Sequence, residues 1–292
     1  MLFGCLVEAL TQKDHKGFNM KNNSNPNKIE SRFSHVFWTY TGTLLLAVTL
    51  VVLLHETGHY LAYRWRGYAA SVHINPFMGA TSTRQTVQPE DFVYIILGGT
   101  VFNLSLASIA AILLRYAKNI NWILIKMYAT MAFLIEGMVL IAGLFFEETV
   151  TDFSWLISLG VHPVFVGILG VLLIVIGGLL NYGAWRSVGV TPQSPRWQIL
   201  LLNTSFLVYV LAGFAIGMVI SPIDIQFIRR FLFVAMLLHW LYLGLRVILN
   251  PYIMPRLQRR MQTGHLELTG NSGRLSMALG CASWVISFLI LN

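Results

Sequence analysis

Charged residues are scarce in this sequence. Asp, Glu, Lys and Arg make up 11% of its 292 residues, whereas a soluble domain carries about 25%. Hydrophobic residues make up 56%, and the mean hydropathy is +0.66. This composition excludes an ordinary water-soluble enzyme and is typical of an integral membrane protein whose helices pack in lipid.

Cysteine and acidic residues are also few. Cys5 and Cys281 lie at opposite ends of the chain, so they provide neither a disulfide framework nor a cysteine metal site. The 12 acidic residues are outnumbered by 20 Lys and Arg, for a formal net charge of +8. Because the basic residues flank apolar segments, we expect them to set topology and contact the lipid bilayer, and we expect no nucleic acid as a partner.

Long apolar runs are abundant. Lipid requires each spanning segment to satisfy its own backbone hydrogen bonds, so helices are expected. The apolar segments lie at 36–63, 92–114, 122–146, 161–180, 199–220, 227–249 and 277–291, of which the last is short. The predicted fold is an all-α polytopic, multi-pass membrane helix bundle of about six or seven transmembrane helices. Residues 1–35 are polar and rich in Asn and Lys, and they are predicted to form a disordered tail.

One connection between these segments, at 64–91, has a different pattern. Val72 and Ile74 alternate with polar residues, and Pro76 and Gly79 interrupt the run. This pattern predicts a short β-hairpin-like segment after the first helix. Its strands would present an edge to which an extended peptide could add.

The first apolar segment contains the sequence His-Glu-Thr-Gly-His at 55–59. On a helix, His55 and His59 share one face, which is the spacing that binds a single zinc ion, with Glu56 beside it as a general base. Ionisable groups are expensive in a bilayer, so their presence at this depth indicates function. The alternative is a pair of structural histidines.

A catalytic zinc site uses three protein ligands and leaves one position open for water. His55 lies about 24 Å along the first helix from Thr39, and two further crossings return the chain to the same side of the membrane. Glu147, Glu148 and Asp152 emerge there, so all three are candidates for the third ligand. Glu136 lies deeper in the third helix, where we favour a protonated, hydrogen-bonded helix contact over a cavity-facing residue.

Three stretches resemble the site-2 protease family of intramembrane zinc metalloproteases, in a divergent branch. The stretch 55–59 follows the His-Glu-x-Gly-His form of the family, and 74–80 resembles its apolar-Pro-Phe-Gly-Gly strand. The stretch 97–103, Leu-Gly-Gly-Thr-Val-Phe-Asn, resembles the small-residue motif that opens the next helix. The resemblance implies a metalloprotease membrane core at 36–183, and residues 184–292 would add further transmembrane helices.

The chain departs from the family at the third ligand. The usual Asn-x-x-Pro-x-x-x-Leu-Asp-Gly pattern is missing, and Thr151-Asp152-Phe153-Ser154-Trp155-Leu156 is similar to a Ser/Thr-Asp-x-x-x-Leu pattern of a divergent branch. On this resemblance Asp152 is the third ligand, with Glu148 as the alternative. One Zn²⁺ would then activate water for peptide hydrolysis, with Glu56 as the base and a membrane-protein or peptide segment as the substrate.

Two further residues are candidate contacts for the transition state or the substrate. His73 and Asn103 could donate to the developing oxyanion, or could serve in structural hydrogen bonds. The rival functions are a catalytically inactive membrane binding or transport protein and a membrane di-iron hydroxylase. The hydroxylase is the weaker rival, because it needs several histidine boxes and this chain has one.

Overall fold

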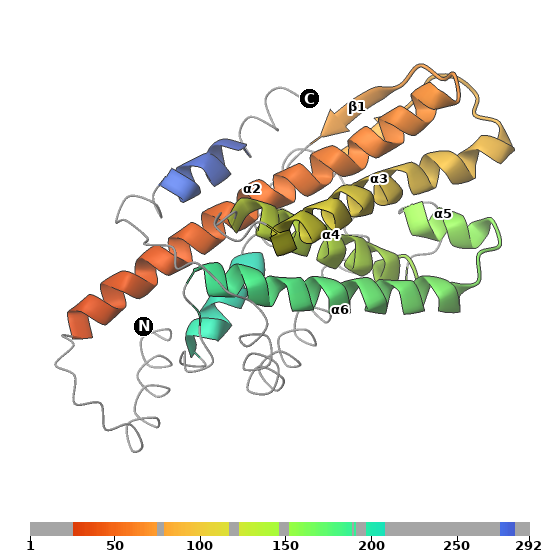
Figure 1. Ribbon diagram of the computed structural model, residues 1–292. Helices are drawn as coiled ribbons and strands as arrows, with labels where there is room; N and C mark the ends of the chain where they lie inside the picture. The colour runs from red at the N-terminus through yellow and green to blue at the C-terminus, as the bar shows by residue number, and fades with distance from the viewer. Residues whose placement is uncertain are drawn as a thin grey trace.

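The computed structural model describes residues 26–74, 79–116, 123–145, 152–188, 190, 197–207 and 275–283. This part of the chain is mostly helical, with one small antiparallel hairpin (Figure 1). The elements are α2 (Pro26–Trp65), β1 (Ser71–Ile74), β2 (Gly79–Ser82), α3 (Pro89–Tyr116), α4 (Ile123–Ala142), α5 (Asp152–Ser158) and α6 (Pro163–Ser187). Two further helical stretches lie at 197–207 and 275–283.

Four helices are long and apolar enough to cross a membrane. They comprise Ser34–Trp65 of α2, Pro89–Leu114 of α3, Ile123–Ala142 of α4 and Pro163–Trp185 of α6. These helices confirm the first four predicted apolar segments. The predicted segments 199–220 and 277–291 are described only in part, and 227–249 lies outside the described residues. The total of six or seven spans stays a prediction.

The first helix begins earlier than predicted. α2 starts at Pro26, within the segment that the sequence predicts to be a disordered tail. Proline suits the first turn of a helix, where its missing N–H group has no partner to lose. From Pro26 onward, the polar segment continues the apolar helix toward the N-terminus, because helical backbone hydrogen bonds do not require apolar side chains. Residues 1–25 lie outside the described part of the chain.

α4 is at the centre of the bundle and packs against α2, α3 and α6. Its contact with α6 is close because glycines face each other: a Cβ added to Gly137 would lie 2.7 Å from the carbonyl oxygen of Gly170. Small residues of this kind let helices approach in membranes. The opposite face of α6 exposes large apolar side chains, as expected where a helix meets lipid: Val164, Phe165, Ile168, Val171 and Leu172.

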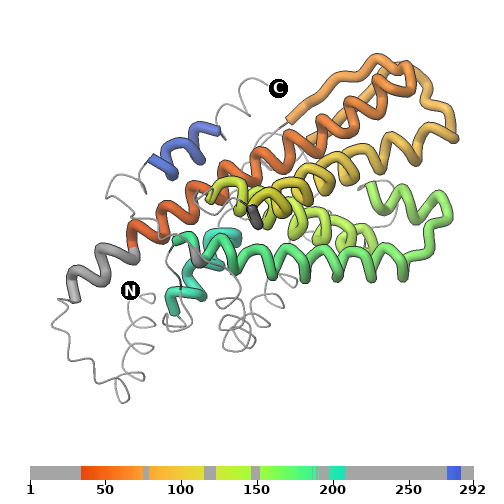
Figure 2. The backbone as a smooth tube through the Cα atoms, viewed as in Figure 1, coloured from red at the N-terminus to blue at the C-terminus, as the bar shows by residue number. Residues whose placement is uncertain are grey.

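The hairpin confirms the predicted β segment. β1 pairs with β2 in antiparallel register, with Val72 opposite Thr81 and Ile74 opposite Gly79. Both strands pack against the C-terminal part of α2, and α5 packs against α3 (Figure 2). One end of the bundle therefore gathers the end of α2, the hairpin, the start of α3 and the short helix α5.

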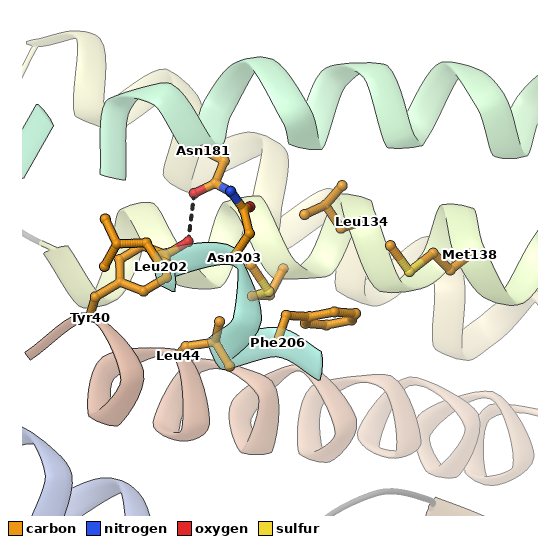
Figure 3. A pocket seen from close by; sticks show the side chains of 9 residues that line it. Tyr40, Leu44, Leu134, Met138, Asn181, Leu202, Asn203 and Phe206 are labelled. Atoms are coloured by element: carbon orange, nitrogen blue, oxygen red, sulfur yellow. Dashed lines mark hydrogen bonds between the residues drawn. The ribbon is translucent and has the colours of Figure 1, made fainter. Parts of the chain in front are cut away.

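Toward the other end of the bundle, buried polar contacts join α2 to α6, and Figure 3 shows the one between Tyr40 and Asn181. Tyr40 of α2 donates a hydrogen bond to Asn181 Oδ1 of α6 at 3.1 Å, and the indole of Trp185 donates to Tyr40 at 3.2 Å. Leu202 and Phe206, from the helical stretch 197–207, line the small pocket beside them. A hydrogen bond of 2.8 Å between the hydroxyl groups of Thr41 and Ser205 ties this helical stretch to α2.

Candidate metal centre

The two histidines of the sequence motif lie one helical turn apart near the C-terminal end of α2. Their side chains point to a common spot, and the two Nε2 atoms are 2.9 Å apart. Both side chains are largely buried, with 16% and 8% exposed. The helical spacing therefore brings the two imidazoles together as the sequence predicts.

Asp152, the first residue of α5, completes the group. Its Oδ2 lies 3.0 Å from Nε2 of His55 and 3.1 Å from Nε2 of His59. α5 is held against α3 by a stacked pair of rings, Phe92 and Trp155, with centroids 5.6 Å apart. In the described part of the chain, this is the single group of three such residues whose atoms could hold a metal ion. Glu147 and Glu148, the other candidate ligands, lie outside the described residues.

The hydrogen bonds at Nδ1 of the two imidazoles indicate whether the Nε2 lone pairs face the centre of the group. Nδ1 of His59 lies 2.7 Å from the carbonyl oxygen of Ile95, and a carbonyl can only accept, so Nδ1 donates. Nδ1 of His55 lies 2.7 Å from Oε1 of Glu136. With Nδ1 protonated in each neutral ring, both Nε2 atoms present lone pairs to the centre, beside the oxygen of Asp152. Three lone pairs that face one point repel one another, and a cation among them turns this repulsion into attraction.

The spacing of these atoms suits a zinc ion. Zinc binds imidazole nitrogen and carboxylate oxygen at about 2.0–2.2 Å in tetrahedral sites, which separates neighbouring ligand atoms by about 3.3 Å. The observed separations of 2.9–3.1 Å are a few tenths of an ångström shorter. The donor set of two nitrogens and one oxygen also matches three-ligand catalytic zinc sites, which leave a position for water.

Asp152 is suited to act as an anionic ligand. Burial alone would raise the pKa of its carboxyl group, but when the imidazoles of His55 and His59 are protonated, their hydrogen bonds and positive charge outweigh that effect and hold the pKa well below its usual range. The side chain is therefore a carboxylate at neutral pH. It still has 29% of its surface exposed, so the centre is reachable from one side.

The hairpin holds the side chain of Glu56, which the sequence predicts to be the general base. Thr81 of β2 donates to Glu56 Oε2 at 2.7 Å, and no described residue donates to Oε1. Gly79 lies so close that an added Cβ would overlap the Glu56 side chain. Glu56 is therefore almost fully buried between α2 and β2.

Paired glycines allow α3 to approach the two imidazoles. A Cβ added to Gly99 would lie 2.5 Å from His59 Nε2 and 2.8 Å from His55 Nε2. A Cβ added to Gly98 would lie 2.8 Å from the Ala62 side chain and 2.9 Å from the carbonyl oxygen of Gly58. The Gly-Gly pair at 98–99 thus has a physical reason: any side chain there would displace the imidazoles or separate the two helices.

The remaining candidates take different places. Asn103 is fully buried, and its amide nitrogen donates to Glu136 while its amide oxygen accepts from Tyr128. Both ends of this amide are thus engaged with protein. His73 lies on β1 with an exposed side chain, and its role as a substrate contact stays a prediction. Glu136 is hydrogen-bonded, as predicted, but its three partners, Thr100, Asn103 and the imidazole of His55, fit an ionised carboxylate better than the protonated one that the sequence predicts.

Sequence reasoning missed two supporting residues. Thr81 holds Glu56, and Thr100 donates to Oε2 of Glu136 at 2.8 Å. A threonine in a strand or an apolar helix is common, so neither position carries a signal in the sequence. The position of Thr100 directly after the Gly-Gly pair at 98–99 was the one available hint, because those glycines mark the close approach of α3 to α2.

Comparison with known proteins adds no assignment. No protein-family model matches this chain, and no curated protein or solved structure matches it either. The resemblance to the site-2 protease family therefore stays a prediction that depends on three short stretches, 55–59, 74–80 and 97–103. What the structure itself establishes is a helical chain with four helices fit to cross a membrane and a His55, His59 and Asp152 group able to hold a metal ion.

Proposed function

We propose that this chain is a multi-pass intramembrane zinc metalloprotease, which hydrolyses a peptide bond in or near the transmembrane segment of a membrane-protein substrate. One observation carries the proposal: two imidazoles and a carboxylate converge within 3.1 Å of one another beside Glu56. This centre lies at the end of a helix that is apolar enough to cross a membrane. The resemblance to the site-2 protease family supports the same activity.

The bound zinc would supply Lewis-acid polarisation of the scissile carbonyl and of a water molecule. His55, His59 and Asp152 would hold it, and the one negative charge of Asp152 would offset part of its charge in a medium that solvates ions poorly. Glu56 takes a proton from water and passes it to the leaving amine. Thr81 holds Oε2 of Glu56, which leaves Oε1 to exchange that proton.

The substrate must present an extended backbone at this end of the bundle. A peptide bond inside a helix has its groups engaged in hydrogen bonds, so the scissile segment has to unwind first. β1 and β2 form a two-stranded sheet directly over Glu56, and a sheet edge can accept an extended segment as a further strand. Substrate helices with residues of low helix propensity, such as Gly, Asn or Pro, are expected to be cleaved most readily.

The test is cleavage in liposomes that contain the full-length chain and a single-pass reporter whose transmembrane helix carries an Asn-Pro interruption. The wild type loaded with zinc is expected to cut the reporter in or near this helix, as read by mass spectrometry. Glu56→Gln should keep its zinc and lose cleavage, because the amide cannot accept the proton.

Three results would contradict the proposal. The first is a purified wild-type chain that binds no zinc, which would favour an inactive membrane binding or transport protein. The second is cleavage by Glu56→Gln at the wild-type rate, which would assign the activity to a contaminating protease. Two bound irons in place of zinc would favour the hydroxylase instead.

A further inference from the structure

A second carboxylate lies behind the metal centre. Glu136 of α4 is 1% exposed, and its Oε1 lies 2.7 Å from Nδ1 of His55, on the ring edge that faces away from Asp152. Asn103 and Thr100 of α3 donate to its Oε1 and Oε2, each at 2.8 Å. This glutamate is therefore the meeting point of three helices, because His55 belongs to α2.

The contacts of Glu136 are those of an ionised acceptor. Asn103 and Thr100 supply donors, and the His55 ring supplies a third from Nδ1. Among the described residues, no Lys or Arg forms an ion pair with this carboxylate. The one basic side chain within ion-pair distance of it is the imidazole of His55. A buried carboxylate without a cation is strongly unfavourable. The nearest place for a compensating positive charge is the centre on the other side of the imidazole.

We propose that Glu136 is a positioning residue for the metal, which acts through His55. This inference rests on the proposed function, because it assigns a role to the surroundings of that same zinc site. The carboxylate fixes the Nδ1–H tautomer of His55, so that the Nε2 lone pair faces the metal, and it makes the ring a more basic ligand. Its negative charge, added to that of Asp152, balances a divalent cation held by two neutral imidazoles.

A further hydrogen bond, from Tyr128, fixes the orientation of Asn103. Tyr128 of α4 donates to Oδ1 of Asn103 at 2.9 Å, which orients the amide so that its nitrogen points at Glu136. This places Asn103 in the support of the metal ligand, through Glu136. The chain Tyr128–Asn103–Glu136–His55 couples the orientation of the imidazole to the packing of α3 against α4.

The test measures metal binding without any substrate. The full-length chain in detergent is stripped with a chelator, and its affinity for Zn²⁺ is measured by competition with an indicator. Glu136→Gln is expected to weaken zinc affinity about 10- to 100-fold, as the loss of such partners does in other zinc sites. With Co²⁺ in place of zinc, the visible absorption bands are expected to shift, because the His55 ring is no longer held.

Thr130→Val is the matched control. Thr130 is a fully buried polar residue on the same helix, its hydroxyl has no hydrogen-bond partner among the described residues, and the substitution keeps its shape. It is expected to bind zinc and cobalt as the wild type does. Glu136→Gln with the affinity and cobalt spectrum of this control would overturn the inference and leave the proposed function intact. A wild type without zinc would overturn both.

A second variant decides the question if Glu136→Gln does not fold. Thr100→Val removes a single donor to the Glu136 carboxylate and leaves the ring contact with His55 in place. It is expected to weaken zinc affinity about three- to tenfold, in proportion to one hydrogen bond of about 1 kcal/mol. Unchanged affinity in this variant would overturn the inference.

Discussion

Adding one methyl group at Gly99 should weaken metal binding by His55 and His59 strongly while leaving the fold in place. The Cβ of an alanine at this position would lie 2.5 Å from Nε2 of His59 and 2.8 Å from Nε2 of His55. Carbon and nitrogen atoms in contact are normally about 3.5 Å apart, so the two ligand atoms must retreat by about 0.7–1 Å. That shift is several times the tolerance of about 0.2 Å on metal–ligand distances.

The expected cost of Gly99→Ala is a loss of zinc affinity of about 100-fold or more, because both imidazoles move at once. The protein should still fold, since alanine is a better helix former than glycine by about 1 kcal/mol. The assay is zinc competition in detergent, combined with thermal unfolding followed by circular dichroism. The variant should unfold close to the wild-type temperature measured without metal.

Gly183→Ala is the matched control for this experiment. Gly183 lies inside α6, and a Cβ built there meets no atom within 4 Å. The control should bind zinc as the wild type does and unfold at the same or a slightly higher temperature. If Gly99→Ala bound zinc as tightly as this control, the close approach of α3 to the imidazoles would be refuted as the reason for the glycine.

Three further outcomes follow from the contacts of the site and its surroundings. Asp152→Asn should lower zinc affinity more than about 100-fold, because it removes an ionised ligand, and a competition titration that gives the wild-type affinity would exclude Asp152 as a ligand. Thr81→Val should slow reporter cleavage about tenfold at unchanged zinc content, since it removes one hydrogen bond to a carboxylate; an unchanged rate would show that Thr81 does not hold the base. Asp91→Asn should lower the midpoint of unfolding, as measured by denaturant titration in detergent micelles, because Asp91 joins Arg66 and Tyr68 at the start of α3; equal stability would assign this cluster no structural role.

The four membrane-fit helices were predictable because apolar length alone identifies them. Their exact ends were less so: α2 begins at Pro26 and α6 continues to Ser187, beyond the apolar segments that the sequence marks. Helix ends depend on local capping and on contacts with neighbouring segments, which hydropathy does not report. The short helix α5 was missed altogether, because seven residues produce no clear periodic pattern.

The three grouped site residues were predictable for two different reasons. His55 and His59 follow from helical spacing, which is a local property of the sequence. Asp152 follows from counting crossings, since two helices return the chain to the same side, and from a resemblance to a divergent family pattern. The roles of Asn103 and Glu136 did not follow, because a sequence does not show which buried polar groups face each other across a helix interface.

The strands of the hairpin were predicted from the sequence, but their contact with Glu56 was not. Alternating residues at 71–74 predicted strands, and the structure confirms them. The contact of Thr81 and Gly79 with Glu56 depends on how the hairpin folds back onto α2. Such a contact is set by tertiary packing, so it could be found only in three dimensions.

The central claim is that His55, His59 and Asp152 hold one zinc ion. The most direct measurement is X-ray absorption at the zinc edge on the detergent-purified, full-length chain, combined with metal analysis per chain. The expected result is about one zinc, with two imidazole nitrogens and carboxylate or water oxygens at about 2.0–2.2 Å. A chain with no stoichiometric zinc, or a zinc whose spectrum is unchanged in His59→Ala, would contradict the account.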